Sequence, residues 1–407
     1  MRHHHVLSSL AAAASTLLAA AVAQATPPAS LTDDASIGTT PARPALAPSA
    51  QVDRDGFEES NPKTIRAVDA PIATDPPPDW AVLHAGLRPR LGTFGGIATF
   101  AIAHARTERF YGGFSFSAIR NDAGTHAGLA QVALGRNLSD SFVGGFQLSL
   151  TENRARNFIG VGQTALAYNR SLDLMGVGQV AAYNRAKRFA GVTQLGAYNR
   201  TDERFSGVAQ LGIFNHAERD FTGFAQLGLL SVTGREIFGE RESGSRDRFA
   251  GVAQVGAVSM TDGNFYGLAQ VGGVSRVSGD FVGAFQIGAL GASADTFRGL
   301  AQTGVVAMSK RSLGIQLGAG AIALDEHTGL QLGAALNLAK SVTGAEIGVA
   351  NLADEVHGVQ IGLFNHARTL RGVQIGLVNY AEDGVLPWTA LLNIGFGDGD
   401  LGGVHDG

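Results

Sequence analysis

Residues 189–204 read FAGVTQLGAYNRTDER, and the residues that follow, 205–220, read FSGVAQLGIFNHAERD. Both segments have an opening phenylalanine, a central glutamine, and an asparagine that precedes a polar stretch. Related segments recur along most of the chain, about sixteen residues apart as far as Gln302 and about fourteen to fifteen apart beyond it. Self-similarity at a short fixed period is typical of repeat proteins, in which each unit packs against its neighbours.

The central glutamine marks the phase of each unit, and Glu346 takes its place once. It occurs at Gln131, Gln147, Gln163, Gln179, Gln194, Gln210, Gln226, Gln254, Gln270, Gln286, Gln302, Gln316, Gln331, Gln360 and Gln374. Two weaker units, centred on Thr99 and Ser115, precede the series, and a terminal unit ends in LPWTALLNIGFG. The pattern predicts about nineteen units of 14–16 residues.

Each unit is expected to contribute a strand. In residues 372–377, GVQIGL, the three aliphatic side chains alternate with glycine and glutamine, which is the period-two pattern of a strand. The 56 glycines also disfavour long helices, because each interior glycine costs a helix about 1 kcal/mol. Polar stretches such as NRTDER supply turn residues between strands. The sequence therefore predicts an all-β repeat array.

Two arrangements fit these units. We favour a β-solenoid with one unit per coil, in which like residues stack in register and the glutamines and asparagines form ladders of side-chain amides. Small residues two positions after asparagine, Ala217 and Ala367, and the following Phe221 and Leu370 are then expected to face inward. The alternative is a transmembrane antiparallel β-barrel, which residues 142–151 support by alternating apolar and polar side chains over about ten residues.

The chain divides by composition into four parts. Residues 1–25 resemble a signal peptide, with Arg2, an uncharged apolar run and the small-x-small site Ala23-Gln24-Ala25. Residues 26–85 are rich in proline and alanine and are expected to be a disordered linker. Residues 86–397 form the predicted β repeat domain, with a charged insertion at 231–248, and residues 398–407 form a predicted disordered tail.

The later units and the closing LPWTALLNIGFG resemble bacterial surface repeat-containing proteins built on G-[VL]-Q-[IL]-G-[LV]-x-N, which occur in spirochaete lipoproteins and in Gram-negative envelopes. This chain lacks the lipidation cysteine of the spirochaete members. The spacing is also similar to the V-x-I-G repeats of trimeric autotransporter adhesin heads, whose inward positions would correspond to Val373 and Ile375. The resemblance implies display at the cell surface or in the periplasm.

Composition and motifs indicate no chemistry. The chain has no cysteine, and its formal net charge of −4 gives no basic field for nucleic acid. We predict no catalytic, cofactor-binding or metal-binding residues. The histidines at 216, 357 and 366 recur after asparagine or near a turn, and we interpret them as solvated turn residues.

One motif is a candidate contact site. The tripeptide YNR occurs in three successive units, and stacking would align its tyrosines and arginines in two rows, at Tyr168, Tyr183 and Tyr198 and at Arg170, Arg185 and Arg200. Both residue types are enriched where proteins bind partners. An envelope glycan, a lipid or a protein are the candidate partners, and the outer membrane is a possible location.

These observations predict an exported, non-enzymatic protein of a Gram-negative cell envelope, with a structural or binding role. The alternative function is that of an outer-membrane barrel, a porin-like channel for small solutes.

Overall fold

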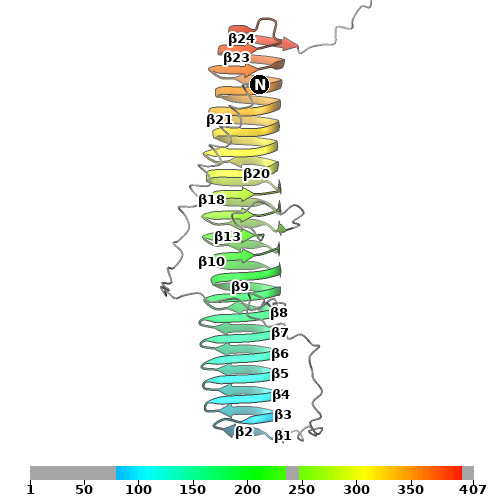
Figure 1. Cartoon of the computed structure of the whole chain (residues 1–407), viewed down its shortest axis with the longest axis vertical. Coiled ribbons are helices and arrows are strands. Elements are labelled where there is room, and N and C mark those ends of the chain that lie inside the picture. Colours follow the sequence, from blue (N-terminus) through cyan, green and yellow to red (C-terminus); the bar gives the residue numbers. More distant parts are fainter. Residues whose placement is uncertain (1–78, 235–246, 397–407) are drawn as a thin grey trace, which may run out of the picture.

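The computed structural model describes residues 79–234 and 247–396, which form one rod of stacked β coils (Figure 1). The described residues contain strands and turns and no helix. The coils number about 18, at about 16 residues each, so the fold is a β-solenoid. None of the structure in residues 79–234 and 247–396 is a helix long and apolar enough to cross a membrane.

The chain winds through 24 strands in sequence order. The first nine are β1 (Asp79–Trp80), β2 (Leu83–Gly86), β3 (Arg90–Ala101), β4 (His104–Ser117), β5 (Arg120–Ala133), β6 (Arg136–Ser149), β7 (Glu152–Ala165), β8 (Tyr168–Val180) and β9 (Tyr183–Ser206). The middle group is β10 (Ala209–Ala217), β11 (Asp220–Thr222), β12 (Ala225–Leu227), β13 (Leu230–Thr233), β14 (Arg248–Ala250), β15 (Ala253–Val255), β16 (Val258–Thr261), β17 (Asn264–Tyr266), β18 (Ala269–Val277) and β19 (Asp280–Val282). The last are β20 (Phe285–Thr303), β21 (Val306–Ile361), β22 (Phe364–Ala367), β23 (Thr369–Ala381) and β24 (Trp388–Phe396).

Neighbouring coils pair in parallel and in register, as the favoured arrangement predicts. Between β6 and β7, for example, Gln147 lies opposite Gln163 and Phe142 lies opposite Phe158. Parallel pairing of successive segments requires a full turn of chain between them, and here each repeat supplies that turn. The barrel alternative is wrong, because a barrel of consecutive hairpins needs antiparallel neighbours and these strands are parallel.

The last unit is the exception. β24 runs antiparallel to β23, with Asn393 opposite Gln374, and its amide nitrogen Nδ2 donates a hydrogen bond to Gln374 Oε1 at 3.2 Å. The terminal segment was expected to be another repeat, and instead it folds back over the last coil at the red end of the rod (Figure 1). It thereby covers an edge that would otherwise be open for pairing with another strand.

The described strands shift two predicted boundaries. β1 and β2 pair in parallel with β3, so the solenoid includes residues before Gly86. Ser231 to Thr233 of the predicted insertion belong to β13, which pairs with β16 in register. The rest of the insertion is short of description, since residues 235–246 lie outside the described ranges. The predicted signal peptide and tail, and all but the end of the predicted linker, lie outside them too.

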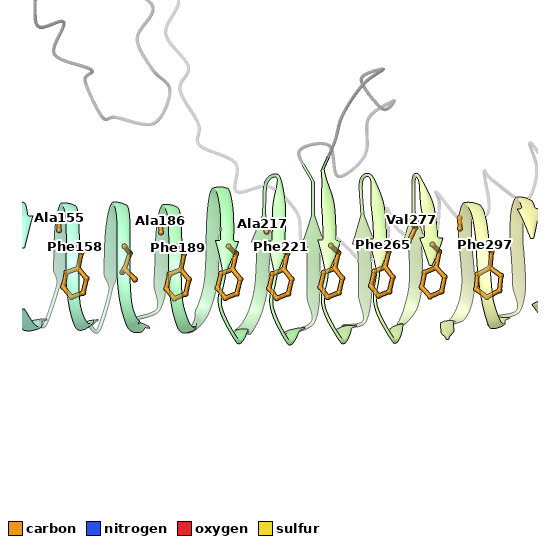
Figure 2. Close-up of a cluster of buried hydrophobic side chains, with 14 of the residues drawn as sticks. Ala155, Phe158, Ala186, Phe189, Ala217, Phe221, Phe265, Val277 and Phe297 are labelled. Carbon is orange, nitrogen blue, oxygen red and sulfur yellow. The ribbon is translucent and has the colours of Figure 1, made fainter. Parts of the chain in front are cut away.

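The interior consists of columns of like side chains. Phenylalanine rings stack face to face along the rod; Phe205 and Phe221 have centroids 4.9 Å apart with parallel planes (Figure 2). This spacing is close to the strand separation of about 4.8 Å, so each ring contacts the rings of both neighbouring coils. Ala217, Ala367, Phe221 and Leu370 are all fully buried, which confirms the predicted inward positions.

Amide ladders complete the interior, as predicted. Gln210 Nε2 donates to Gln194 Oε1 of the preceding coil at 2.8 Å, and Asn199 Nδ2 donates to Asn215 Oδ1 of the following coil at 2.9 Å. Every amide in such a column both donates and accepts, so a fully buried polar group finds partners without water. The ladder continues across the insertion, because Gln254 Nε2 donates to Gln226 Oε1 at 2.8 Å.

The direction of the aliphatic side chains differs from the expectation taken from adhesin heads. Gln374 is fully buried, whereas Ile375 is 44% exposed. The glutamine therefore points inward and the aliphatic residue outward, and the prediction that Val373 and Ile375 face inward is wrong. A strand buries one of two alternating sets, and the amide ladder takes the inner side here.

Candidate functional site

One side of the rod is free of charge along its whole length. We call the residue stacked in the glutamine ladder of each coil the ladder position, and we call the residues from two before it to four after it the apolar face. Thr99, Ser115 and Glu346 fill the ladder position where glutamine does not. Apart from the buried Glu346, no Asp, Glu, Lys or Arg occurs in this segment in any coil from residue 97 to residue 378.

Large aliphatic and aromatic side chains of the apolar face point into solvent. In one coil Val208, two before the ladder position, is 49% exposed, and Ile213, three after it, is 58% exposed. The same positions in the next coil hold the exposed Phe224 and Leu229. Because the coils stack in register, each position forms a column of apolar side chains parallel to the rod axis.

Glycines produce a groove between two of these columns. The residue two after the ladder position is glycine in many coils, and a Cβ atom on Gly362 would lie 2.4 Å from the carbonyl oxygen of Gly348 in the coil before. Only glycine fits so close to the neighbouring backbone. Between Leu317 and Leu377 these glycines floor a shallow apolar groove whose walls include Ile361 and Leu363.

The side of the coil between the asparagine and the phenylalanine has the opposite character. Its charged residues pair across coils; Arg188 Nη2 lies 2.6 Å from Asp173 Oδ2, and Lys310 Nζ lies 2.6 Å from Asp295 Oδ1. Such exposed pairs stabilise a fold weakly and keep the surface solvated. Each coil therefore has a charged side that favours water and an uncharged apolar side.

The structure aligns the six residues of the YNR motif as predicted. Tyr168, Tyr183 and Tyr198 stack in successive coils, with ring centroids 5.8 and 5.0 Å apart, and Tyr198 stacks on Phe214 at 4.7 Å. Burial raises the pKa of the Tyr198 hydroxyl above its ordinary value. These rings lie at the edge of the apolar face and extend it with aromatic surface.

The arginines of the motif already have acidic partners. Arg185 is largely buried, and its Nε lies 3.0 Å from Oδ2 of Asp202. Arg200 bonds to the same carboxylate, at 2.9 Å from Oδ1, and also to Glu218. Arg170 stacks in register with Arg185 and is not free. The row therefore serves mainly to hold neighbouring coils together, and the tyrosines are its accessible part.

Two titratable side chains interrupt the interior columns. His126 takes a phenylalanine position between Phe110 and Phe142, with ring centroids 4.5 and 5.1 Å apart, and burial lowers its pKa to about 3. Glu346 takes a glutamine position, where burial raises its pKa to about 7 although Gln360 donates to Oε2. Both are neutral forms near pH 6, matching the uncharged columns they join.

The protonated form of Glu346 explains the ladder geometry at this coil. Neither Glu346 Oε1 nor Gln331 Oε1 in the coil before it has a hydrogen-bond partner among the described residues. A proton on Glu346 Oε1 would make it the donor that the ladder needs at that step, toward the free oxygen of Gln331. The carboxylic acid then acts as an analogue of the glutamine amide.

The histidines do not form a site. His216 was expected in solvent and is instead buried, with Nε2 3.0 Å from the carbonyl oxygen of Gly234, and burial lowers its pKa. His357 is exposed, as predicted, and His366 is partly buried against the ring of Tyr380 at 5.1 Å. In the part of the chain that the structure describes, no three His, Asp or Glu side chains converge in a way that could hold a metal ion.

Comparison of the chain with protein-family models, with curated proteins and with solved structures gave no match. The class that the structure itself defines is a β-solenoid repeat scaffold. Sequence reasoning predicted the Tyr and Arg rows and did not find the apolar face. The signal for that face was present, since the absence of charge around every ladder position can be read from the aligned units.

Proposed function

We propose that this protein is an exported, non-enzymatic scaffold of a Gram-negative cell envelope, and that it binds through its apolar face. One observation carries the proposal: a surface free of exposed charge runs along the whole rod. Isolated apolar residues are normal on soluble proteins, but the largest contiguous patch on a monomer usually covers about 300–600 Å². A far larger patch indicates an interaction surface.

Two further observations support the location. Residues 1–25 have the charge, the apolar run and the cleavage motif of a secretory signal. The chain also lacks cysteine, so export to an oxidising compartment imposes no disulfide requirement on its folding. The resemblance to bacterial surface repeat proteins points the same way. The stacked tyrosines beside the face suit a partner with an apolar part and a polar edge.

Fractionation of a Gram-negative host that expresses the full chain tests this proposal. We expect a processed protein with Thr26 at its N-terminus in the envelope fractions, and retention in the cytoplasm after deletion of residues 2–25. Mass spectrometry of the purified N-terminus reads the cleavage directly. An unprocessed chain found only in the cytoplasm would contradict the proposed location.

Charge placed on the apolar face tests its role. The double variant Leu195→Lys with Leu227→Lys adds two cations to exposed positions of the face, one residue after Gln194 and Gln226. We expect it to lose its envelope partner and to be recovered in the soluble fraction after cell lysis. Ser206→Lys with Thr222→Lys is the matched control, because it adds the same charge to exposed positions outside the face.

A further inference from the structure

We propose that the partner of the apolar face is a second copy of this chain, so that two solenoids pack face to face along their length. This inference rests on the proposed function and names the occupant of its binding surface. Three features of the face support it: its size, its relief and its period.

The size matches an obligate dimer. About 18 coils at about 4.8 Å each give a face roughly 85 Å long, and six residues across at about 3.3 Å each give a width of roughly 20 Å. Each copy would therefore bury roughly 1,700 Å². The total for two copies falls within the range of about 2,000–5,000 Å² that is typical of obligate homodimers with apolar interfaces.

The relief of the face is self-complementary. The residues one after the ladder position form a ridge, represented by Ile347, Ile361 and Ile375, and the groove beside it has a floor of glycines that includes Gly348 and Gly362. A ridge of one copy has the width and the apolar character to enter the groove of the other. Paired sheets with interdigitated side chains pack about 10 Å apart and exclude water.

The period distinguishes a second copy from a lipid surface. Like side chains recur on this face at each coil, so a ridge presents one side chain about every 4.8 Å. Another solenoid with the same repeat stays in step with it over the whole rod, whereas a bilayer has no period and requires no groove. The straight stacking of the coils in Figure 1 keeps the face continuous over that length. Each copy uses the same surface, so the assembly closes at two.

Sedimentation analysis of the mature chain, Thr26–Gly407, in detergent-free buffer tests the inference. We expect a dimer for the natural sequence, a dimer for Ser206→Lys with Thr222→Lys, and a monomer for Leu195→Lys with Leu227→Lys. Burying two unpaired cations per copy should weaken association roughly 100-fold or more. Circular dichroism of each variant shows whether the strands are retained, so that loss of the dimer is not confused with loss of the fold.

The result that overturns the inference is a monomer for the natural sequence at concentrations up to roughly 50 μM, where even a weak dimer of standard affinity would form. Flotation with neutral phospholipid vesicles then separates the two levels of the account. A monomer that floats, and whose Leu195→Lys with Leu227→Lys variant does not, contradicts the second copy and leaves the proposed binding face in place. A monomer that does not float contradicts both.

Discussion

Coils on the two sides of Gln302 differ in one step of their path. Before it, five residues lead from the buried phenylalanine to the buried glutamine, as from Phe221 to Gln226; after it, four residues do, as from Val356 to Gln360. The stacked column changes with the step, from phenylalanine in the first region to valine and leucine in the second. The transition coils hold Ser312 and His327, which hydrogen-bond to each other at 2.6 Å.

The shorter step requires a different backbone. In each short coil the glycine two residues before the ladder position has a positive φ, for example 135° at Gly344 and 145° at Gly358. Side chains disfavour this conformation, and glycine tolerates it. The comparison shows that the solenoid can lose a residue per coil if a left-handed glycine makes the corner and a smaller side chain fills the reduced interior.

Gly358→Ala should break the short coils with the largest effect. A Cβ atom there would lie 1.9 Å from the carbonyl oxygen of Gly344, at a φ that alanine disfavours. We expect a loss of about 3–5 kcal/mol in the free energy of unfolding. Gly207→Ala in a long coil should cost less, because φ is not left-handed there and the same distance is 2.8 Å. Gly320→Ala, which meets nothing within 4 Å, is the control. Equal losses at Gly358 and Gly320 in chemical denaturation would contradict the packing described.

His126→Phe should change the acid stability of the long coils. A pKa held at about 3 in the folded state, below its ordinary 6.5, means that stability is present at neutral pH and is lost as pH falls from about 6.5 toward 3. That loss should amount to roughly 4 kcal/mol, and the phenylalanine variant should not show it. Hydrogen exchange near residues 110–142 at pH 4 and pH 7 measures the difference. An identical pH response in both proteins would show that this histidine does not limit acid stability.

Glu346→Gln should change the stability of the short coils in the opposite direction of pH. Its folded-state pKa of about 7 lies above its ordinary 4.5, so stability is full below about pH 4.5 and is lost as pH rises through about 7. The loss should be about 3 kcal/mol above pH 7, and the glutamine variant should retain that stability because its amide needs no proton. Glu346→Ala at pH 8 serves as a control for side-chain removal. A glutamine variant that is no more stable than the natural protein at pH 8 contradicts the assigned proton.

The sequence was sufficient for much of this fold and for less of its surface. The aligned glutamines and asparagines predicted the amide ladders, and the small residue after asparagine predicted the inward alanines, because in-register stacking places like residues together. The orientation of Ile375 was missed, since alternation shows that two sets face opposite sides and does not show which set is buried. The reversal of β24 was missed because its composition resembles that of the other units.

The candidate site shows the same limit. The YNR rows follow from register alone and were predicted, but their ion pairs with Asp202 and Glu218 join different coils and depend on side-chain geometry. The burial of His216 against Gly234 has the same origin. A periodic sequence predicts which residues share a column; it does not predict which of the polar columns are exposed.

The central claim is that each glutamine-marked unit adds one coil to a straight stack. Spin labels at Tyr111→Cys, Ser206→Cys and Arg298→Cys, taken two at a time in this cysteine-free chain, test it most directly. The three positions are exposed and occupy one column, and labelled protein diluted with unlabelled protein limits the measurement to distances within one copy. Six, five and eleven coils at about 4.8 Å predict separations of about 29, 24 and 53 Å. Distances that add in this way support the rod, and a separation between the outermost labels no longer than the two shorter ones would contradict it.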